Sequence, residues 1–279
     1  MPGVWIEAAL NGPWGRERQP LIPITVEDIV ADGIAAAQAG CAIVHVHAYD
    51  ERTGRQADDW QTYARIIEGI RARQNVIVYP TIPLAGSQRF AHVEELARRG
   101  LIEWTVLDPG SVGFARFATL HDADKSFIYE NPHSDILDGM RIAREYKLHP
   151  GFAIYEPGFT RLGAALAAAS NVPQPIYRFM FSQEFAWGFP PRNDYLDAHR
   201  ALLDELAPGS PWMVAGLGVD IRELIPYAIR CGGGLRVGLE DAPWGTDRTN
   251  SDWVREAVSI VRSTGSEPAT SAEVREILS

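Results

Sequence analysis

The sequence predicts an α/β fold of the (β/α)8 TIM-barrel class, with residues 1–279 forming one barrel domain. Short apolar runs alternate along the chain with longer amphipathic segments, and there are eight such pairs. Several of the short runs are almost continuously apolar, as expected for parallel strands covered on both faces. The length of 279 residues also fits a barrel, which typically takes about 250 residues. An open doubly wound sheet is the alternative, but no Gly-x-Gly-x-x-Gly motif follows the first run.

The expected strands are short and apolar, and they cover residues 4–10, 42–48, 75–81, 102–108, 151–156, 176–183, 212–218 and 235–240. The expected helices show apolar residues at helical spacing, and they cover residues 25–40, 58–73, 93–100, 136–146, 161–170, 194–209, 220–233, 252–265 and 270–279. The first helix has Thr25 as its N-cap and Gly40 at its end. Residues 109–132 form the longest irregular stretch, and such a loop is often a functional lid.

The bulk composition argues against several classes of partner. A net charge of −10 disfavours nucleic acid, because phosphate binding needs clustered Lys and Arg. No apolar run approaches the ~20 residues of a membrane span, and the first residues do not resemble a signal peptide. Cys41 and Cys231 are the only cysteines, so we expect no disulfide framework and a cytoplasmic location.

A candidate metal site lies in the segment IVHVHAYDERTGRQ, at the end of the second expected strand. His45 and His47 are two residues apart, so in a strand they project from the same face. Barrel active sites form at the carboxyl ends of the strands. Strand eight ends in RVGLED, where the alternation places Arg236, Gly238 and Glu240 on one face. Strands two and eight flank strand one in a closed barrel, so Glu240 could approach the histidines.

Two imidazoles and one carboxylate with an open position form a known catalytic zinc set, and they also resemble the ligands of non-haem Fe(II). The alternative is that the histidines are hydrogen-bonded core residues and that the acidic pair Glu240–Asp241 only pairs with Arg236. Asn11, Thr81 and Glu156 also stand at strand ends, where each could hold substrate or cap a helix.

Tryptophans follow three of the expected strands. Trp14, Trp187 and Trp244 lie in the loops after strands one, six and eight. They could make the mouth of the barrel aromatic, which would favour an apolar or cationic substrate group. Packing at a subunit interface is an equally good interpretation.

The sequence resembles a known enzyme family nearly from end to end. The segments that carry this resemblance are LIPIT, AGCAIVHVHAYDERTGRQ, YEPG, VAGLG, GGGLRVGLED and PATSAEVREIL. In them the chain resembles the β-keto acid cleavage enzymes, the family of 3-keto-5-aminohexanoate cleavage enzyme. The resemblance implies a (β/α)8 barrel with one Zn²⁺ per chain, assembled as a homo-oligomer such as a dimer or tetramer. It implies His45, His47 and Glu240 as metal ligands and Asp241 as the base, oriented by Arg236.

The family reaction is a retro-Claisen exchange in which a β-keto acid and acetyl-CoA give acetoacetate and a new CoA ester. In that chemistry the metal polarises the keto oxygen. We expect Asp241, beside a cation and a metal, to have a depressed pKa and to take a proton from the substrate.

The chain departs from the family where the substrate is held. Pro80-Thr81-Ile82-Pro83 replaces the Ser or Thr and Thr-Gly-Gly that commonly hold the keto acid, and proline removes a backbone donor. Asn11-Gly12-Pro13-Trp14 stands where the family has an acid, and Ala242 replaces an Asn. We therefore expect a retained metal site with an altered substrate cradle. A metal-dependent hydrolase or aldolase with the same ligands, or a binding protein without turnover, are the alternatives.

Overall fold

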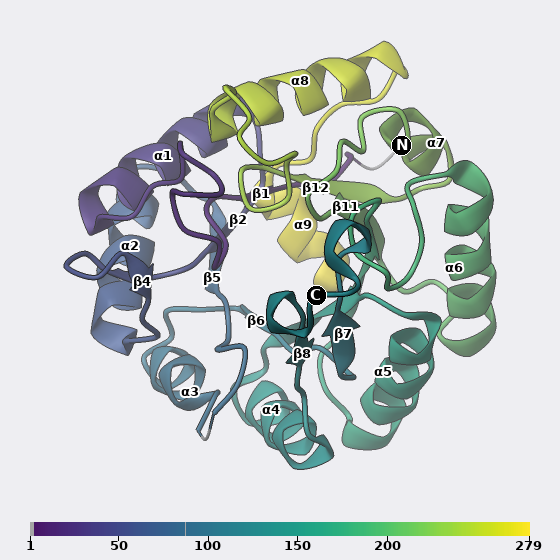
Figure 1. The fold of residues 1–279 in the computed structure, drawn as a ribbon, viewed down its shortest axis with the longest axis horizontal. Coiled ribbons are helices and arrows are strands. Elements are labelled where there is room, and N and C mark those ends of the chain that lie inside the picture. The colour runs from purple at the N-terminus through teal and green to yellow at the C-terminus, as the bar shows by residue number, and fades with distance from the viewer. Residues whose placement is uncertain (1–2, 87) are drawn as a thin grey trace.

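A ring of parallel strands occupies the centre of the molecule (Figure 1). The computed structural model describes residues 3–86 and 88–279. The strands of the ring are β1 (Ile6–Ala9), β2 (Ile43–Val46), β5 (Ile77–Pro80), β6 (Trp104–Val106), β9 (His149–Ile154), β10 (Ile176–Phe181), β11 (Trp212–Gly216) and β12 (Gly234–Val237). Their order is β5-β2-β1-β12-β11-β10-β9-β6, and each hydrogen-bonded pair is parallel. The end strands β5 and β6 are in contact, and the rings of Tyr79 and Trp104 lie 5.8 Å apart between them. The near-closed barrel confirms the predicted fold class.

Helices surround this ring (Figure 1). They are α1 (Val26–Ala39), α2 (Trp60–Arg71), α3 (Ala91–Arg98), α4 (His133–Tyr146), α5 (Pro157–Ser170), α6 (Asn193–Leu206), α7 (Ile225–Arg230) and α8 (Asn250–Ser263). Thr25 caps α1 by accepting a hydrogen bond from the Asp28 amide, and Gly40 ends it with a φ of 119°. Helix α7 is shorter than expected because Pro226 stands in its first turn, where the missing N–H is tolerated. Among the described residues, no helix has both the length and the apolar character that crossing a bilayer requires.

The last helix, α9 (Ser271–Leu278), covers the end of the barrel where the strands begin. The Ser271 hydroxyl donates to the carbonyl of Ala42, directly before β2, at 2.8 Å. The Ala269 amide donates to Val4 at 2.9 Å, so both chain ends are tied to this floor. At the opposite end, where the strands finish, the loops that follow the strands cover the barrel.

Strand β12 ends sooner than the alternation of residues predicts. Gly238 has a φ of +134°, a region that favours glycine, and a Cβ there would lie 2.3 Å from the Ala9 carbonyl oxygen. The chain turns at this point, and the Asp241 amide donates to the Gly238 carbonyl at 3.1 Å. Glu240 therefore follows the strand in a turn, which corrects the expectation that Arg236, Gly238 and Glu240 share one strand face.

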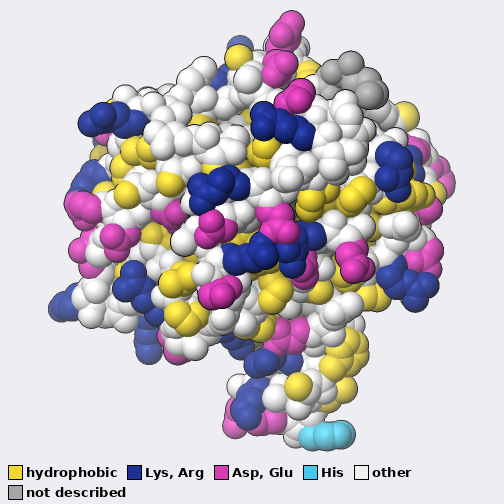
Figure 2. Space-filling model, turned by 90° about the horizontal axis from the view of Figure 1, so that it is seen from above, with side chains coloured by type: hydrophobic (Ala, Val, Ile, Leu, Met, Phe, Trp, Pro, Cys, Tyr) yellow, Lys and Arg dark blue, Asp and Glu magenta, His cyan; other side chains and the backbone are white. Residues whose placement is uncertain are grey.

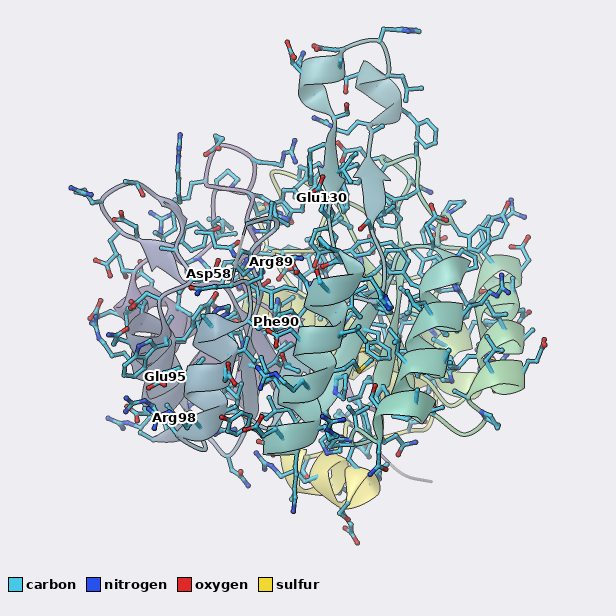
Figure 3. The ribbon with its side chains drawn as sticks, turned by 90° about the horizontal axis from the view of Figure 1, so that it is seen from below. Asp58, Arg89, Phe90, Glu95, Arg98 and Glu130 are labelled. Atoms are coloured by element: carbon cyan, nitrogen blue, oxygen red, sulfur yellow. The ribbon has the colours of Figure 1, made fainter. Side chains whose placement is uncertain are left out.

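Two hairpins interrupt the β/α alternation at the carboxyl end of the barrel. β3 (Tyr49–Asp50) pairs with β4 (Arg55–Gln56) after β2, and β7 (Val112–Phe114) pairs with β8 (Phe127–Tyr129) after β6. The β7–β8 hairpin carries short 3-10 turns at 117–119 and 123–125. It stands out from the body of the molecule at the end opposite α9 (Figure 3), and the same projection is visible in the space-filling view (Figure 2). The stretch 109–132, expected to be irregular, is thus largely an ordered hairpin.

The base of the β7–β8 hairpin is fixed by buried polar contacts. Arg89 donates to the carbonyls of Pro83 at 2.8 Å and Glu130 at 2.7 Å, and to the side chain of Asn131 at 2.9 Å (Figure 3). On its other side, the Phe117 amide donates to the Glu184 carbonyl at 2.9 Å. The hairpin is therefore tied to the loops that follow β5 and β10.

Candidate metal centre and active site

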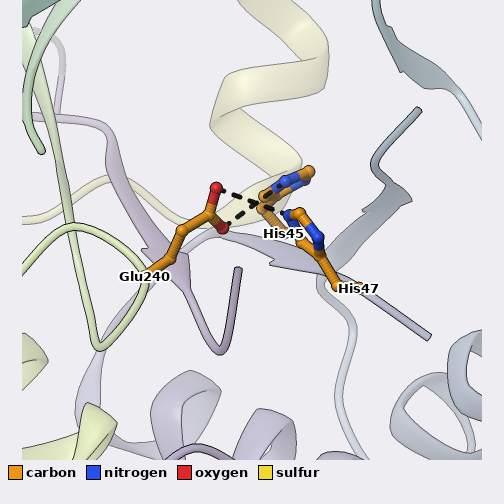
Figure 4. Close-up of side chains that lie close together, drawn as sticks. All are labelled: His45, His47 and Glu240. Atoms are coloured by element: carbon orange, nitrogen blue, oxygen red, sulfur yellow. Dashed lines mark ion pairs between the residues drawn. The ribbon is translucent and has the colours of Figure 1, made fainter. Parts of the chain in front are cut away.

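Two histidines and one glutamate meet at the carboxyl end of the barrel (Figure 4). His45 lies on β2, in register with Ala9 of β1 and Tyr79 of β5, and His47 follows that strand directly. Nε2 of His45 is 3.6 Å from Oε2 of Glu240, and Nε2 of His47 is 3.4 Å from Oε1. One donor atom from each residue lies within 4.8 Å of the other two. The structure brings together the three residues expected as metal ligands, which we call the His–His–Glu cluster.

The cluster has the donor atoms that a divalent metal ion needs. Nε2 of His47 and Oε2 of Glu240 are buried and have no hydrogen-bond partner within the described chain, and on the His45 ring, whose Nε2 faces Glu240, Nδ1 is unpaired as well. Buried polar atoms are normally paired, so unpaired atoms on all three residues of the cluster require an explanation. Burial lowers the pKa of His45 well below its usual range, so its imidazole is neutral, the form that binds metal. The residues fit a bound ion.

His47 is oriented by groups that the sequence did not reveal as functional. Its Nδ1 lies 2.9 Å from Oε1 of Gln56. The amide nitrogen of Gln56 donates to both oxygens of Asp58 at 3.0 Å, and the Tyr63 hydroxyl donates to Asp58 at 2.8 Å. Because Asp58 fixes the Gln56 amide, Oε1 faces His47 and accepts its Nδ1–H. The lone pair of His47 is then on Nε2, which faces Glu240.

Asn11 holds the backbone of His47. Its Oδ1 accepts from the His47 amide at 2.9 Å, and its Nδ2 donates to the carbonyls of His47 at 2.9 Å and Pro23 at 3.0 Å. The side chain is fully buried and is not among the residues lining the cavity. Asn11 thus lies behind the cluster, whereas its position at a strand end had suggested a substrate contact.

Arg236 links both acidic residues of the turn after β12. Its Nε and Nη2 donate to the two oxygens of Asp241 at 2.7 and 2.9 Å, and Nη2 is also 2.7 Å from Oε1 of Glu240. Burial opposes ionisation of Glu240, but Arg236, His47 and His45 together outweigh it and hold the pKa of Glu240 well below its usual range. The Arg236 guanidinium therefore fixes the carboxylates of Glu240 and Asp241 beside each other.

Asp241 has the opposite pKa shift from the one expected. Burial raises its pKa to about 6, although the charge and hydrogen bonds of Arg236 lower it. The chain's own groups therefore do not give Asp241 the depressed pKa expected beside a cation and a metal, because removal of the carboxylate from water outweighs the neighbouring cation. Asp241 also lies behind Arg236 and is not among the residues that line the cavity.

A buried ion pair between Glu7 and Arg178 forms the floor of the site. Arg178 of β10 donates to Glu7 of β1 at 3.3 Å and to the Tyr79 hydroxyl at 2.5 Å, and that hydroxyl donates to Glu7 at 2.5 Å. Arg236 also reaches Glu7 at 3.3 Å. Sequence reasoning missed Glu7 and Arg178, although each is a charged residue inside an otherwise apolar strand. A buried charge that must be paired was the available signal.

A small cavity that is partly open to solvent lies beside these groups. His45, His47 and Glu240 line one side of it, and Arg178 and Arg236 line its base. Its entrance faces the loops at the carboxyl ends of the strands, which is the usual place for a barrel active site.

Of the expected substrate contacts, Thr81 lines the cavity and Glu156 does not. The Thr81 carbonyl is 2.7 Å from Nε2 of His92, a residue without an expected role. Glu156 accepts a hydrogen bond from the Gly188 amide at 3.1 Å and so joins the loops after β9 and β10. The structure therefore places only Thr81 where it could touch a ligand.

The side of the cavity opposite the cluster is aromatic. Phe114, Phe127, Tyr129 and Tyr155 line it, and we call these four the aromatic box. Phe114 stacks on Phe127 at 4.9 Å and lies edge-on to Tyr155 at 5.5 Å, while Tyr129 and Tyr155 are 6.0 Å apart. The three box residues on β7 and β8 fall in the stretch expected as a lid.

The three tryptophans of the mouth have different surroundings. Trp14 lines the cavity and lies edge-on to Trp244 at 5.1 Å. The guanidinium of Arg18 lies 5.4 Å from the Trp14 ring and 4.9 Å from the Trp244 ring, within cation–π distance. Trp187 is buried behind Tyr155, whose ring is 5.0 Å away. Only Trp14 contributes to the cavity wall.

Asp108 is a further carboxylate in this wall that the sequence had not identified. It follows β6 by two residues and is 4% exposed. Its two oxygens accept hydrogen bonds from the Ala153 amide at 2.7 Å and from the Tyr129 hydroxyl at 2.8 Å. Burial raises its pKa, and these two hydrogen bonds only partly oppose the shift.

Comparison with known proteins agrees with this geometry. A model of the beta-keto acid cleavage enzyme family matches residues 3–279. The 3-keto-5-aminohexanoate cleavage enzyme of Fusobacterium nucleatum is 27% identical over 95% of this chain and 93% of that protein. The 3-oxoadipate:acetyl-CoA acetyltransferase of Cupriavidus necator is 27% identical over 98% of this chain and 93% of that protein.

Solved structures show the same fold at lower sequence identity. The apo structure of ObcA superposes with a TM-score of 0.76 and 16% identity, and the match covers 93% of this chain and 65% of that one. The sequence match is the stronger statement, because the family model covers nearly every residue. The chain belongs to the beta-keto acid cleavage enzyme family.

Proposed function

We propose that the protein cleaves a β-keto acid in a zinc-dependent exchange with acetyl-CoA. The bond between carbons 2 and 3 of the keto acid breaks, and the released acyl group is transferred to the CoA sulfur. The acetyl group of acetyl-CoA joins carbon 2, giving acetoacetate. The observation that carries this proposal is the buried His–His–Glu cluster with its unpartnered donor atoms. Membership of the family and relatives named for acetyl-CoA-dependent transfer support it.

The charges around the cavity also favour a divalent cation. Its charged lining residues and their direct ion partners are the carboxylates Glu7, Asp108, Glu240 and Asp241 and the guanidiniums Arg178 and Arg236. Four acids against two bases leave an excess of two negative charges when all are ionised. Buried charges are stable only when they are compensated, so a doubly charged ion at the cluster would balance the set. Two imidazoles and a carboxylate favour zinc.

A bound ion would supply Lewis acidity, polarising the keto oxygen of the substrate. His45, His47 and Glu240 would hold it, and Gln56 keeps the Nε2 lone pair of His47 available. Arg236 and Arg178 line the base of the cavity, where they can attract the carboxylate of a keto acid.

We assign the proton transfer to Asp241. A carboxylate with a pKa of about 6 is ionised at neutral pH and is a stronger base than an ordinary aspartate. It directly follows Glu240, and Arg236 holds both of its oxygens. Because Asp241 lies behind Arg236, it reaches the substrate only if the Arg236 side chain adjusts when substrate binds.

The test is an assay of purified protein with a panel of β-keto acids, with and without acetyl-CoA, in which acetoacetate is measured. Protein stripped with a chelator and protein reloaded with zinc provide the matched pair. Acetoacetate that forms only with acetyl-CoA and only after zinc is restored is the expected result. Cleavage that proceeds equally without any thioester would instead identify a metal-dependent hydrolase or aldolase. Turnover that survives complete removal of metal would refute the zinc assignment.

A further inference from the structure

Arg178 is a buried guanidinium that keeps an unused hydrogen-bond donor. It lies on β10 and is 1% exposed. Its Nη2 donates to the Glu7 carboxylate at 3.3 Å and to the Tyr79 hydroxyl at 2.5 Å, whereas its Nε–H is buried and unpaired among the described residues. Burial opposes its charge, but the neighbouring Glu7 keeps the pKa of Arg178 raised, so the side chain is a cation. A buried cation with an unpaired donor indicates that a further acceptor binds there, and an anion fits it best.

Arg236, the other guanidinium at the base of the cavity, is already engaged through all three of its nitrogens. Its Nε and Nη2 donate to Asp241 at 2.7 and 2.9 Å, and Nη2 is also 2.7 Å from Glu240. Its Nη1 donates to Glu7 at 3.3 Å. A substrate carboxylate at Arg236 would meet three carboxylates that already hold this side chain. At Arg178 it would meet only the carboxylate of Glu7.

The stretch that follows β5 has few donors to offer an anion. Pro80 and Pro83 carry no N–H. The Thr81 amide donates to the carbonyl of Val46 at 3.1 Å, and the Thr81 hydroxyl donates to the carbonyl of Ile82 at 3.3 Å. The donors of Pro80, Thr81 and Pro83 are therefore either missing or already used, so this stretch does not replace Arg178 as an anion site.

The neighbouring strand β9 leaves the guanidinium of Arg178 accessible from the cavity. Ala153 is in register with Arg178, and both residues line the cavity. At Gly151, two residues earlier on the same face of β9, a Cβ would already touch Nη2 of Arg178 at 3.4 Å. The small residues of β9 thus leave space beside the charged group for a ligand.

Arg178 also lies close to the His–His–Glu cluster, through Tyr79. The ring of Tyr79 is 4.7 Å from the ring of His45, and its hydroxyl is 2.5 Å from Nη2 of Arg178. In a β-keto acid a single carbon separates the keto carbon from the carboxyl carbon. The two groups that hold these parts of the substrate must therefore be near neighbours, as the cluster and Arg178 are.

We propose that Arg178 binds the carboxylate of the β-keto acid, whereas Arg236 only positions Glu240 and Asp241. This inference rests on the proposed function and assigns the carboxylate subsite within it. The keto oxygen is held at the cluster and the carboxylate at the floor beside β10. The acyl side chain is then directed away from the floor, towards the aromatic box and the mouth of the cavity.

The test measures binding without turnover. The probes are 3-hydroxybutyrate, which lacks the keto group that is cleaved, and its primary amide, which has nearly the same shape but no charge. Calorimetry with zinc-loaded wild-type protein, in the absence of acetyl-CoA, should show the carboxylate binding about 10- to 100-fold tighter than the amide, the range expected for one charge-assisted contact. Equal affinities for the two probes would overturn the inference.

Arg178→Gln should abolish most of this preference, and Arg178→Lys, which keeps the charge but not the planar guanidinium, should retain part of it. Because a bound metal also attracts a carboxylate, the variants are compared with the wild-type protein at equal zinc content. A purely structural role would change the affinities for both probes alike and leave their ratio unchanged. A ratio in Arg178→Gln equal to that of the wild-type protein would therefore overturn the inference.

A crystal structure of the zinc-loaded wild-type protein with 3-hydroxybutyrate tests the contact even if the variants do not fold. The carboxylate oxygens of the ligand should lie within hydrogen-bond distance of the Arg178 guanidinium. A carboxylate bound to Arg236, or to the stretch Pro80–Pro83, with Arg178 left uncontacted would overturn the inference.

The outcome is separable from that of the proposed function. Absence of acetoacetate from every keto acid would refute the proposed reaction and leave the preference for the carboxylate measurable. Formation of acetoacetate by Arg178→Gln with the KM of the wild-type protein for the keto acid would keep the reaction and refute the role of Arg178.

Discussion

The two sides of the cavity differ in how their buried charges are paired. On the side of β2 and β12, which we call the metal side, Arg236 is paired with Glu7, Glu240 and Asp241. On the side of β6 and the β7–β8 hairpin, the hairpin side, aromatic rings surround the carboxylate of Asp108, which forms no ion pair with any of the described residues. The difference suggests that one side holds the reacting groups and the other selects what reaches them.

The supporting structure differs in the same way. His45 is on a central strand, and Asn11 and Gln56 fix His47 by hydrogen bonds. Phe114, Phe127 and Tyr129 belong to an inserted hairpin that rises above the barrel (Figure 3). Groups on central strands are held more precisely than groups on loops, and loops change more readily. We therefore expect large effects on turnover from the metal side and smaller effects on selectivity from the hairpin side.

Removal of a cluster histidine should have the largest effect. We expect His47→Ala or His45→Ala to lose zinc and to lower turnover by more than about 10⁴-fold, since a Lewis acid contributes several kcal/mol to the transition state. Elemental analysis and the acetoacetate assay measure the two effects. His121→Ala, at an exposed site on the hairpin, is the control and should retain both zinc and activity. An equal zinc content in the wild-type protein and all of these variants would show that the cluster is not the metal site.

The acidic neighbours on the metal side should respond differently from each other. Glu240→Gln removes a ligand charge and should weaken zinc binding. Asp241→Asn should keep zinc and lower turnover by roughly 10²–10⁴-fold, the loss typical of a missing general base. Zinc content and kcat measured on both variants decide between the roles. If Asp241→Asn loses the metal and Glu240→Gln keeps it, the two assignments are reversed.

Replacement of Gln56 should have a smaller effect on zinc binding, and it tests how the ring of His47 is oriented. Without its Oε1, His47 is free to take the other tautomer or to rotate, so Gln56→Ala should weaken zinc binding about 10- to 100-fold. Competition with a chromogenic chelator measures this affinity. Gln61→Ala, at an exposed position on α2, removes the same side chain away from the site and should have no effect. Unchanged affinity in Gln56→Ala would show that Asn11 and the strand alone position His47.

The sequence predicted the metal side well because its residues follow strand geometry. Alternation placed His45 and His47 on one face, and the strand order brought Glu240 near them. Glu240 reaches the histidines from a turn and not from the strand face that the alternation predicted. This turn at Gly238 depends on the close approach of the Ala9 carbonyl. Such an approach is a tertiary contact that local patterns do not contain.

The hairpin side and the buried ion pairs were not predictable in the same way. Gln56 belongs to a segment that reads as a polar turn, and its contact with His47 exists only once β3 and β4 pair. Asp108 accepts a hydrogen bond from the hydroxyl of Tyr129, which is 21 residues further along the chain and is placed by the register of β7 and β8. Local propensity cannot supply these long-range pairings.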